Sequence, residues 1–175
     1  MIITAHTSDV EPAVLAEARE LCDAAFDGEF SDEDWEHALG GVHALVWDGD
    51  ELVGHGSVVQ RRLVHGGRAW RTGYVEAVAV REDRRKRGHG AAVMTALEDV
   101  VRGAYELGAL GAAEDAVDFY AARGWRRWLG PTSVLAPGGP ERTEEDDGGV
   151  FVLPVTADVD LSGPLACDWR GGDVW

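Results

Sequence analysis

The alternation of apolar and polar residues predicts that much of the first half of the chain is strand. Two short glycine-containing segments interrupt this pattern, Asp48-Gly49-Asp50 and Gly66-Gly67. Such segments favour tight hairpins. Apolar side chains at every second position are typical of half-buried strands. Four runs rich in β-branched residues are therefore expected to be strands, at residues 1–6, 42–47, 52–64 and 69–80. The last three should form an antiparallel meander.

Helical spacing marks the segments between these strands. An acidic start with Pro12 precedes apolar residues such as Val14, Ala18 and Leu21, which lie on one face of a helix. Ser31 with an acid three residues later predicts a second, short helix that runs to residue 39. A third helix carries Val93, Leu97 and Val101, and a fourth is expected at residues 114–122. Later strands are expected at residues 105–110, 127–136 and 150–155.

Length and composition indicate one globular domain. The 175 residues are 45% hydrophobic and 27% charged, which is enough apolar material for a single substantial core. We expect one domain over residues 1–175, with an acidic polar loop at residues 137–149 and a C-terminal tail at residues 156–175 that returns to the site. A disordered tail is the alternative, because chain ends ordinarily fray.

The chain is strongly acidic. Its 32 Asp and Glu residues against 16 Lys and Arg give a formal net charge of −16. That balance argues against nucleic-acid binding and makes a cationic small molecule a plausible partner. The alternative is that the acidic surface serves only to keep the protein soluble.

The cysteines and the lengths of the apolar runs indicate the cellular compartment of the protein. Cys22 and Cys167 lack metal-ligand spacing, so no metal site is expected and a reduced, cytoplasmic protein is favoured, although a single disulfide stays open. The sequence has neither a signal-peptide pattern nor an apolar run of membrane-spanning length. We therefore expect no contact with a membrane.

A basic turn lies between the fourth strand and the third helix. It places five cations within residues 81–87, and Gly88 and Gly90 follow. Glycine lets the backbone turn closely, and the first N–H groups of a helix have no intrahelical partner. The segment therefore predicts a cradle for a diphosphate. A P-loop is excluded because G-x-x-x-x-G-K-[ST] is absent, and a solvated loop is the alternative.

Two motifs together resemble the GCN5-related N-acetyltransferases (GNAT). Arg85-x-x-Gly88-x-Gly90 matches their R/Q-x-x-G-x-G/A signature, and Phe119-Tyr120-x-x-x-Gly124-Trp125 resembles a second family segment. The resemblance implies an α+β fold with a mixed, mostly antiparallel, splayed sheet flanked by helices, and acetyl-CoA as co-substrate. A bulge in the 69–80 strand would free backbone groups for the pantetheine arm. The implied cofactor-binding residues are Val78, Ala79, Val80, Arg85, Lys86, Arg87, Gly88, His89 and Gly90.

Longer segments are similar to the aminoglycoside 2'-N-acetyltransferases of actinobacteria. The resemblance implies acetylation of a 2'-amino group by direct attack in a ternary complex, without an acetyl-enzyme. Glu76 would accept the proton of the amine, the Val78 N–H would hold the oxyanion, and Tyr120 would protonate the leaving thiolate. The similar segments are residues 34–45, 60–63, 73–76, 130–137 and 167–175.

The same resemblance implies an acidic acceptor pocket, because aminoglycosides carry several ammonium groups. The sequence departs from the family pattern at Glu29, where aspartate is usual, and at Gly111 to Ala113, where serines are expected. The acidic run that supplies the pocket continues to Asp147, and the Trp175 carboxylate would add a further anion. The implied pocket residues are Glu29, Asp34, Glu76, Ala77, Gly111, Glu145, Asp146, Asp173 and Trp175.

Other functions stay open from the sequence. The same fold serves many acceptors, so a polyamine or an intermediate of cell-wall or thiol biosynthesis is an alternative substrate. A CoA-binding regulatory module without turnover is a third possibility, and Glu76 would then be a strand glutamate that faces solvent. GNAT proteins are often dimers, so a homodimer is expected.

Overall fold

The computed structural model describes residues 1–175, which divide into two compact units. Unit 1 comprises Met1–Val59 and Val75–Val100, and unit 2 comprises Gln60–Tyr74 and Val101–Trp175. Each unit is described here by itself. The organisation as one domain stays a prediction.

Unit 1 contains an antiparallel set of strands near the N-terminus. Strand β1 (Ile2–His6) pairs with β2 (Val42–Asp48), and β2 pairs in turn with β3 (Glu51–His65). Val42 lies opposite Val58, and the register shifts between Val46 and Trp47. The β2–β3 hairpin turns where the Asp-Gly pair predicted it.

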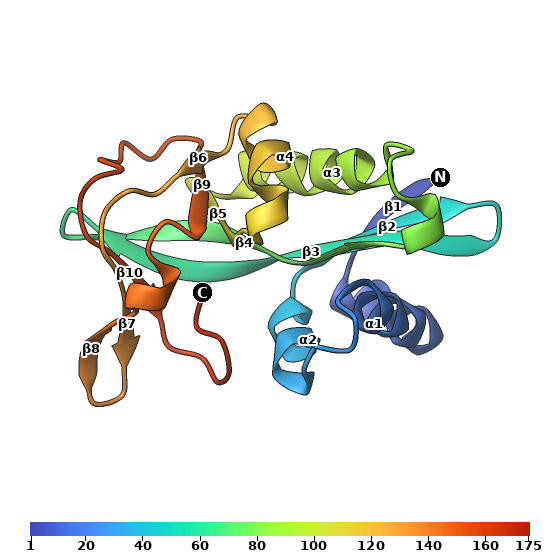
Figure 1. The fold of residues 1–175 in the computed structure, drawn as a ribbon, viewed down its shortest axis with the longest axis horizontal. Coiled ribbons are helices and arrows are strands. Elements are labelled where there is room, and N and C mark those ends of the chain that lie inside the picture. The colour runs from blue at the N-terminus through green and yellow to red at the C-terminus, as the bar shows by residue number, and fades with distance from the viewer. The chain divides into compact units, whose positions relative to one another are not determined.

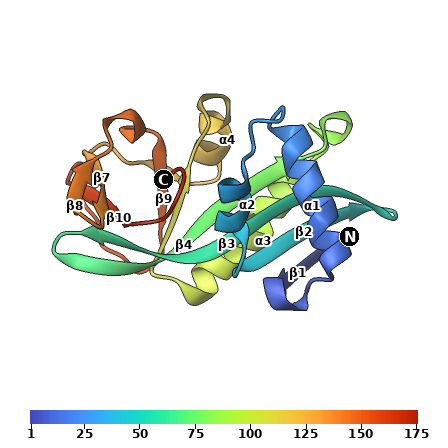
Figure 2. The same ribbon diagram turned by 90° about the horizontal axis from the view of Figure 1, so that it is seen from below.

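Three helices cover these strands. Helix α1 (Pro12–Ala25) has proline in its first turn, α2 (Asp32–Ala38) begins with a capping box, and α3 (His89–Ala104) follows the basic turn. Figures 1 and 2 agree that α1 and α2 lie on one face of the strands of unit 1 and α3 on the other. Ala18 and Cys22 of α1 are fully buried and pack with Leu45 and Leu52 of the strands, so the amphipathic face predicted for α1 is the one that contacts the sheet.

Strand β4 (Arg68–Val80) has a break in its regular conformation. Within unit 2 it pairs in parallel with β5 (Leu107–Gly111), and this pairing ends where Tyr74 lies opposite Ala109. Farther along, in unit 1, Ala77 has φ 51°. A left-handed residue inside a strand interrupts the regular ladder, which is the kind of irregularity that the family resemblance implies for this strand.

The sheet of unit 2 joins segments that are far apart in the sequence. Its strand order is β6-β9-β5-β4-β3-β10-β7-β8, in which β4–β5 and β10–β7 are parallel. Side chains such as Leu107, Trp128, Phe151 and Leu165 are fully buried within the unit. The remaining strands are β6 (Arg126–Arg127), β7 (Thr132–Ala136), β8 (Gly139–Arg142), β9 (Val150–Pro154) and β10 (Leu165–Asp168).

Two predictions of local structure in unit 2 were wrong. The strand expected at 127–136 is two strands, because the main-chain N–H groups of Leu129 and Gly130 between them donate to the carbonyl of Leu161 instead. The helix expected at 114–122 begins with a 3-10 turn, and α4 proper is Val117–Ala122.

The C-terminal third is more regular than its composition suggests. The expected polar loop at 137–149 contains strand β8 and the 3-10 turn Glu144–Asp146. The tail forms β10, which lies between β3 and β7, with Cys167 opposite Leu63. The tail is thus part of the sheet of unit 2 and is not a frayed end.

Candidate active site

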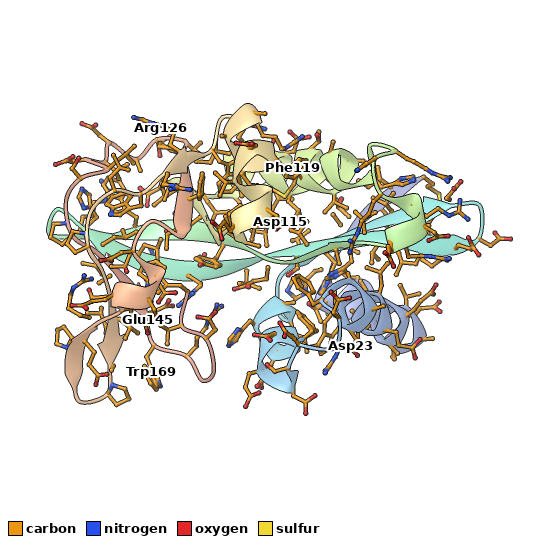
Figure 3. The ribbon with its side chains drawn as sticks, in the orientation of Figure 1. Asp23, Asp115, Phe119, Arg126, Glu145 and Trp169 are labelled. Atoms are coloured by element: carbon orange, nitrogen blue, oxygen red, sulfur yellow. The ribbon has the colours of Figure 1, made fainter.

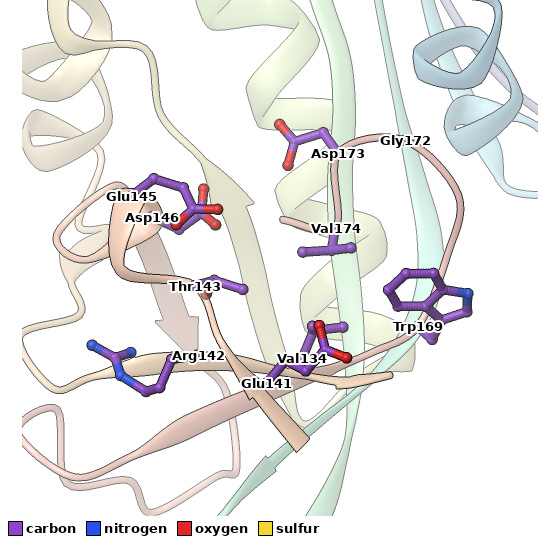
Figure 4. A pocket seen from close by; sticks show the side chains of 10 residues that line it. All are labelled: Val134, Glu141, Arg142, Thr143, Glu145, Asp146, Trp169, Gly172, Asp173 and Val174. Carbon is purple, nitrogen blue, oxygen red and sulfur yellow. The ribbon is translucent and has the colours of Figure 1, made fainter. Parts of the chain in front are cut away.

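An acidic pocket lies in unit 2. One part of it has a volume of about 410 Å³ and a neighbouring part about 310 Å³, and both are lined by Glu145, Asp146 and Asp173. In Figure 4 the carboxylates of Glu145 and Asp146 lie side by side, Asp173 lies across from them, and Arg142 points away. The structure therefore brings together three of the acids that the sequence assigned to the acceptor.

The turn that presents Glu145 and Asp146 is held by the residue that follows them. Asp147 accepts hydrogen bonds from the Thr132 main-chain N–H at 2.8 Å and from the Arg142 guanidinium at 2.7 Å. The hydrogen bond from Arg142 is the main reason that the pKa of Asp147 lies well below its usual range. Asp147 thus links β7, β8 and the turn, and its role toward the acceptor stays a prediction.

The wall opposite the turn is the last segment of the chain. The Trp175 indole N–H donates to Thr143 Oγ1 at 2.9 Å, and the Trp175 main-chain N–H donates to Asp173 Oδ1 at 3.1 Å. Arg170 also donates to the Trp175 oxygen. A Cβ added to Gly111 would lie 3.7 Å from the Trp175 carbonyl carbon. Gly111, Asp173 and Trp175, predicted from distant parts of the sequence, are therefore neighbours.

The clustering of carboxylates changes the titration of Asp146. Burial, followed by repulsion from Asp173 and Glu145, raises the pKa of Asp146 to about 6. Like charges in one pocket disfavour full ionisation, and a cation placed among them relieves the repulsion. The electrostatics of the pocket thus favour a cationic ligand.

Tyr120 is positioned by aromatic packing in unit 2. Its side chain lies in α4, is only 8% exposed, and packs against Phe119 and Trp125 at ring-centroid distances of 5.2 and 6.4 Å. Burial raises the pKa of Tyr120 to about 12. The phenol therefore keeps its proton at neutral pH, which is the state that a proton donor needs. Gly124, with φ 90°, ends the helix as its C′ glycine.

The β4 residues assigned to catalysis lie in unit 1. Glu76, Ala77 and Val78 are half-buried, and Ala79 is buried. The Ala77 carbonyl accepts a hydrogen bond from His55 Nδ1 at 2.9 Å, so this irregular part of the strand is fixed by a side chain of the neighbouring strand.

Several arginines of the basic turn form ion pairs and hydrogen bonds with other residues of unit 1. Arg84 pairs with Asp48 and Glu51 at 2.6 and 2.7 Å, and Arg81 pairs with Asp83. Arg85, which the sequence assigned to the cofactor, donates to the carbonyls of Ala25 and Val80. Two of the five cations, Arg81 and Arg84, are thus engaged in ion pairs, and the role of Arg85 toward the cofactor stays a prediction.

What remains for an anion is the centre of the turn. Lys86 and Arg87 are exposed, and Lys86 and Gly88 have φ 62° and 86°. The Gly88 carbonyl accepts from the Ala92 N–H at 2.9 Å, so α3 starts here with His89 and Gly90. No atom lies within 4 Å of the position that a Gly88 Cβ would take. An open cradle, a helix start and two exposed cations fit the diphosphate of acetyl-CoA.

The two acids predicted near the N-terminus are placed differently. Asp34 accepts from the Ser31 main-chain N–H at 2.8 Å and completes the capping box of α2. Glu29 is exposed in the loop after α1. Their roles toward an acceptor stay predictions, and one oxygen of Asp34 is already used by the helix.

Sequence reasoning missed several residues of the acidic pocket. Trp169 is 52% exposed and lines the larger part together with Val134, Glu141 and Thr143. Figure 3 shows Trp169 and Glu145 on separate segments of unit 2. No local pattern singles these residues out, because the pairing of β10 with β7 is what brings them to one place.

Gly88→Val should weaken acetyl-CoA binding on the order of tenfold, because a β-branched side chain at φ 86° is strained and projects into the open cradle. Isothermal titration calorimetry with acetyl-CoA measures the change. Gly103→Ala, near the end of helix α3 with free space around the new methyl group, is the control and should bind normally. Equal affinity of folded Gly88→Val would remove this turn from the cofactor site.

The chain is similar to known acetyltransferases in sequence and in fold. An aminoglycoside 2'-N-acetyltransferase from Mycolicibacterium fortuitum is 54% identical over 174 residues, which are 97% of this chain and 89% of that protein. A GNAT family acetyltransferase from Brucella melitensis, solved in complex with acetyl-CoA, matches 98% of the chain and 97% of its own length with a TM-score of 0.63 at 15% identity.

Longer solved structures match as well. A probable N-acyltransferase from Enterococcus faecalis V583 matches 74% of this chain with a TM-score of 0.60 at 17% identity, and the chain spans 33% of its length. None of the helices combines the length and apolar character that crossing a membrane requires.

The family model of the acetyltransferase (GNAT) domain matches residues 7–128. The predicted α+β fold, with its mixed sheet and flanking helices, is confirmed by this match and by the solved neighbours. Acetyl-CoA is accordingly the co-substrate. The chain belongs to the GNAT acetyltransferase family.

Proposed function

We propose that the protein transfers the acetyl group of acetyl-CoA to the 2'-amino group of an aminoglycoside. The observation that carries this proposal is the pocket lined by Glu145, Asp146 and Asp173, in which burial and then the neighbouring carboxylates raise the pKa of Asp146. Such a pocket suits a compact ligand with several ammonium groups. The 54% identity to a named aminoglycoside 2'-N-acetyltransferase supports the acceptor and the position.

Acetyl-CoA supplies a thioester, and the residues of this chain handle protons and charge around it. Glu76 accepts the proton that the attacking amine must lose, directly or through water, because a protonated amine has no lone pair to attack with. The Val78 N–H stabilises the negative charge that develops on the carbonyl oxygen. Tyr120 gives its proton to the sulfur as the carbon–sulfur bond breaks, and its high pKa keeps that proton in place beforehand.

The acidic pocket orients the acceptor. Asp146, Glu145 and Asp173 pair with ammonium groups other than the one that reacts. Val134 and the exposed face of Trp169 line the remainder of the pocket, where the less polar face of a sugar ring packs against the indole.

A CoA-release assay tests the proposal. Two matched aminoglycosides are compared, one with a 2'-amino group and one with a 2'-hydroxyl group, and the product is located by NMR. The proposal requires turnover of the first and none of the second. Acetylation of spermidine with no turnover of either aminoglycoside would replace the acceptor by a polyamine.

The pocket predicts a pH dependence for the acceptor. Asp146 has a raised pKa of about 6, so it gains a proton as the pH falls from 7 to 5 and its attraction for a cation is lost. The KM for the aminoglycoside should therefore rise by up to about tenfold per pH unit below pH 6. Asp146→Asn should raise KM at pH 7 and flatten this dependence, while the KM for acetyl-CoA stays constant. A parallel rise of KM in both proteins would show that Asp146 does not face the acceptor.

The family resemblance also leads us to propose a homodimer that works in the cytoplasm. Light scattering of the purified protein at several concentrations measures the mass directly. A mass equal to that of one 18.8 kDa chain at all concentrations would contradict the dimer.

A further inference from the structure

Two buried histidines of unit 1 have no part in the chemistry described so far. His43 in β2 and His55 in β3 are both 0% exposed. His43 Nδ1 lies 2.9 Å from His55 Nε2, and His55 Nδ1 lies 2.9 Å from the Ala77 carbonyl oxygen. At the other end, His43 Nε2 lies 2.8 Å from Thr7 Oγ1. The four residues form one continuous chain of hydrogen bonds that ends on β4.

The direction of every hydrogen bond in this chain follows from its last member. A carbonyl oxygen only accepts, so the proton of His55 is on Nδ1 and its Nε2 accepts. His43 Nδ1 must then donate to it, and His43 Nε2 accepts the hydroxyl proton of Thr7 at 2.8 Å, a shorter contact than the 3.2 Å between Thr7 Oγ1 and the Gly41 carbonyl. The Gly40 main-chain N–H donates to Thr7 Oγ1 at 2.9 Å. All donors therefore point the same way, toward Ala77.

Both rings are kept neutral and fixed in orientation. Burial lowers the pKa of His43 and of His55 to about 4, so neither carries a charge at neutral pH. Trp35 packs against both rings, with centroid distances of 6.4 Å to His43 and 5.6 Å to His55. A neutral imidazole has one donor and one acceptor, and both are used on each ring in this series of hydrogen bonds.

The hydrogen-bonded carbonyl belongs to an unusual peptide group. Ala77 has φ 51°, a conformation that is unfavourable for a residue with a side chain and persists only where its surroundings enforce it. Cys22 Sγ lies 3.7 Å from the same carbonyl oxygen, as a weaker second donor. The Ala77 carbonyl and the Val78 N–H are part of one planar, conjugated unit. A donor on the carbonyl therefore polarises the N–H and makes it a stronger donor itself.

We propose that His43 and His55 are positioning residues that hold and polarise the peptide bond between Ala77 and Val78, so that the Val78 N–H binds the thioester oxygen more strongly. The inference rests on the role proposed above for Val78. The simpler alternative is that the pair only satisfies buried polar groups. The two differ in what happens to the bound thioester when the histidine is removed and the fold is retained.

The test measures the carbonyl stretching frequency of bound acetyl-CoA by infrared difference spectroscopy, with and without ¹³C in the carbonyl carbon. In the wild-type protein the frequency should be lower than in free acetyl-CoA. His55→Phe keeps the ring but removes both polar atoms, so the frequency should move back toward that of free acetyl-CoA. The kcat should fall on the order of tenfold, the loss expected for one weakened hydrogen bond.

Two further variants provide a rescue and a control. His55→Asn places an amide N–H near the position of Nδ1 and should restore most of the frequency shift and of kcat. Ser57→Ala changes another fully buried polar residue of β3, whose hydroxyl has no hydrogen-bond partner, and should leave both unchanged. If His55→Phe does not fold, His43→Phe removes the donor to His55 Nε2 and should give a smaller shift in the same direction.

The outcomes separate this inference from the proposed acceptor. A folded His55→Phe protein with the wild-type frequency overturns the inference, even if kcat is lower, because the histidine then acts only on the fold. A wild-type frequency equal to that of free acetyl-CoA overturns it as well. The infrared measurement needs no acceptor, so failure of every aminoglycoside to react would count against the proposed function and not against the histidine pair.

Discussion

Glu76→Gln should lower kcat about 10²-fold and leave the Kd for acetyl-CoA within about twofold of the wild-type value. Glutamine has nearly the shape of glutamate but takes no proton from the amine. Glu76 lies on β4 next to Ala77, and its side chain is half-buried. The change therefore affects proton transfer more than packing.

The pH profile distinguishes a base from a structural glutamate. In the wild-type protein kcat falls on the acidic side as the base is protonated, and this limb should flatten in Glu76→Gln. Glu20→Gln, at an exposed position of α1, is the control and should cost little. A Glu76→Gln protein with the wild-type rate and profile would show that another group takes the proton.

Trp175→Ala should lower the free energy of unfolding by about 3 to 5 kcal/mol. The indole is only 6% exposed and donates to Thr143 Oγ1, so truncation leaves a cavity and removes one of the hydrogen bonds of this hydroxyl, which still donates to Thr132 Oγ1. Because the Trp175 main-chain N–H also donates to Asp173, the wall of the acidic pocket should loosen and the KM for the aminoglycoside should rise more than the KM for acetyl-CoA.

The chain provides a matched control for this substitution. Trp169 belongs to the same C-terminal segment but is 52% exposed, so Trp169→Ala should cost less than about 1 kcal/mol. Urea unfolding followed by far-UV circular dichroism compares the two variants. Equal losses of stability would mean that the Trp175 indole does not hold the segment in solution.

Local signals explain which elements were predictable. Helix α2 is marked by Ser31 and Asp34, and the β2–β3 hairpin by Asp48-Gly49-Asp50, because each signal lies within a few residues of the feature it specifies. Strand β10 has no such signal. Cys167 pairs with Leu63 and with Val134, and a polar tail becomes a strand only because distant partners are already in place.

The residues of the candidate site also fall into those that the sequence identified and those that it did not. The resemblance identified Asp146, Asp173 and Trp175, which the structure places around one pocket. It did not assign Trp169 to the pocket. The residues that surround an exposed tryptophan in a polar tail cannot be read from the local sequence. The sequence of the basic turn also did not show that Arg84 is engaged in ion pairs, because its partners Asp48 and Glu51 lie on the β2–β3 hairpin.

The conformation of Ala77 was also beyond the reach of pattern reading. Apolar and polar residues around it alternate as in an ordinary strand. An alanine does not indicate a positive φ, and yet Ala77 has φ 51°. The carbonyl of Ala77 lies 2.9 Å from Nδ1 of His55, a residue that is 22 positions away in the sequence. A histidine on the inner face of a strand looks the same in sequence whether it supports a neighbouring peptide group or merely fills space.

The central place of β10 has a consequence for the order in which the molecule can be made. Leu63 emerges from the ribosome long before Cys167, its partner in the sheet, and sequence-distant pairing of this kind is slow to form. The segment that carries Asp173 and Trp175 follows β10, so this wall of the acidic pocket is synthesised after both β3 and β7. A chain released before residue 165 would keep the basic turn of unit 1 but would lack β10 and the pocket wall that follows it.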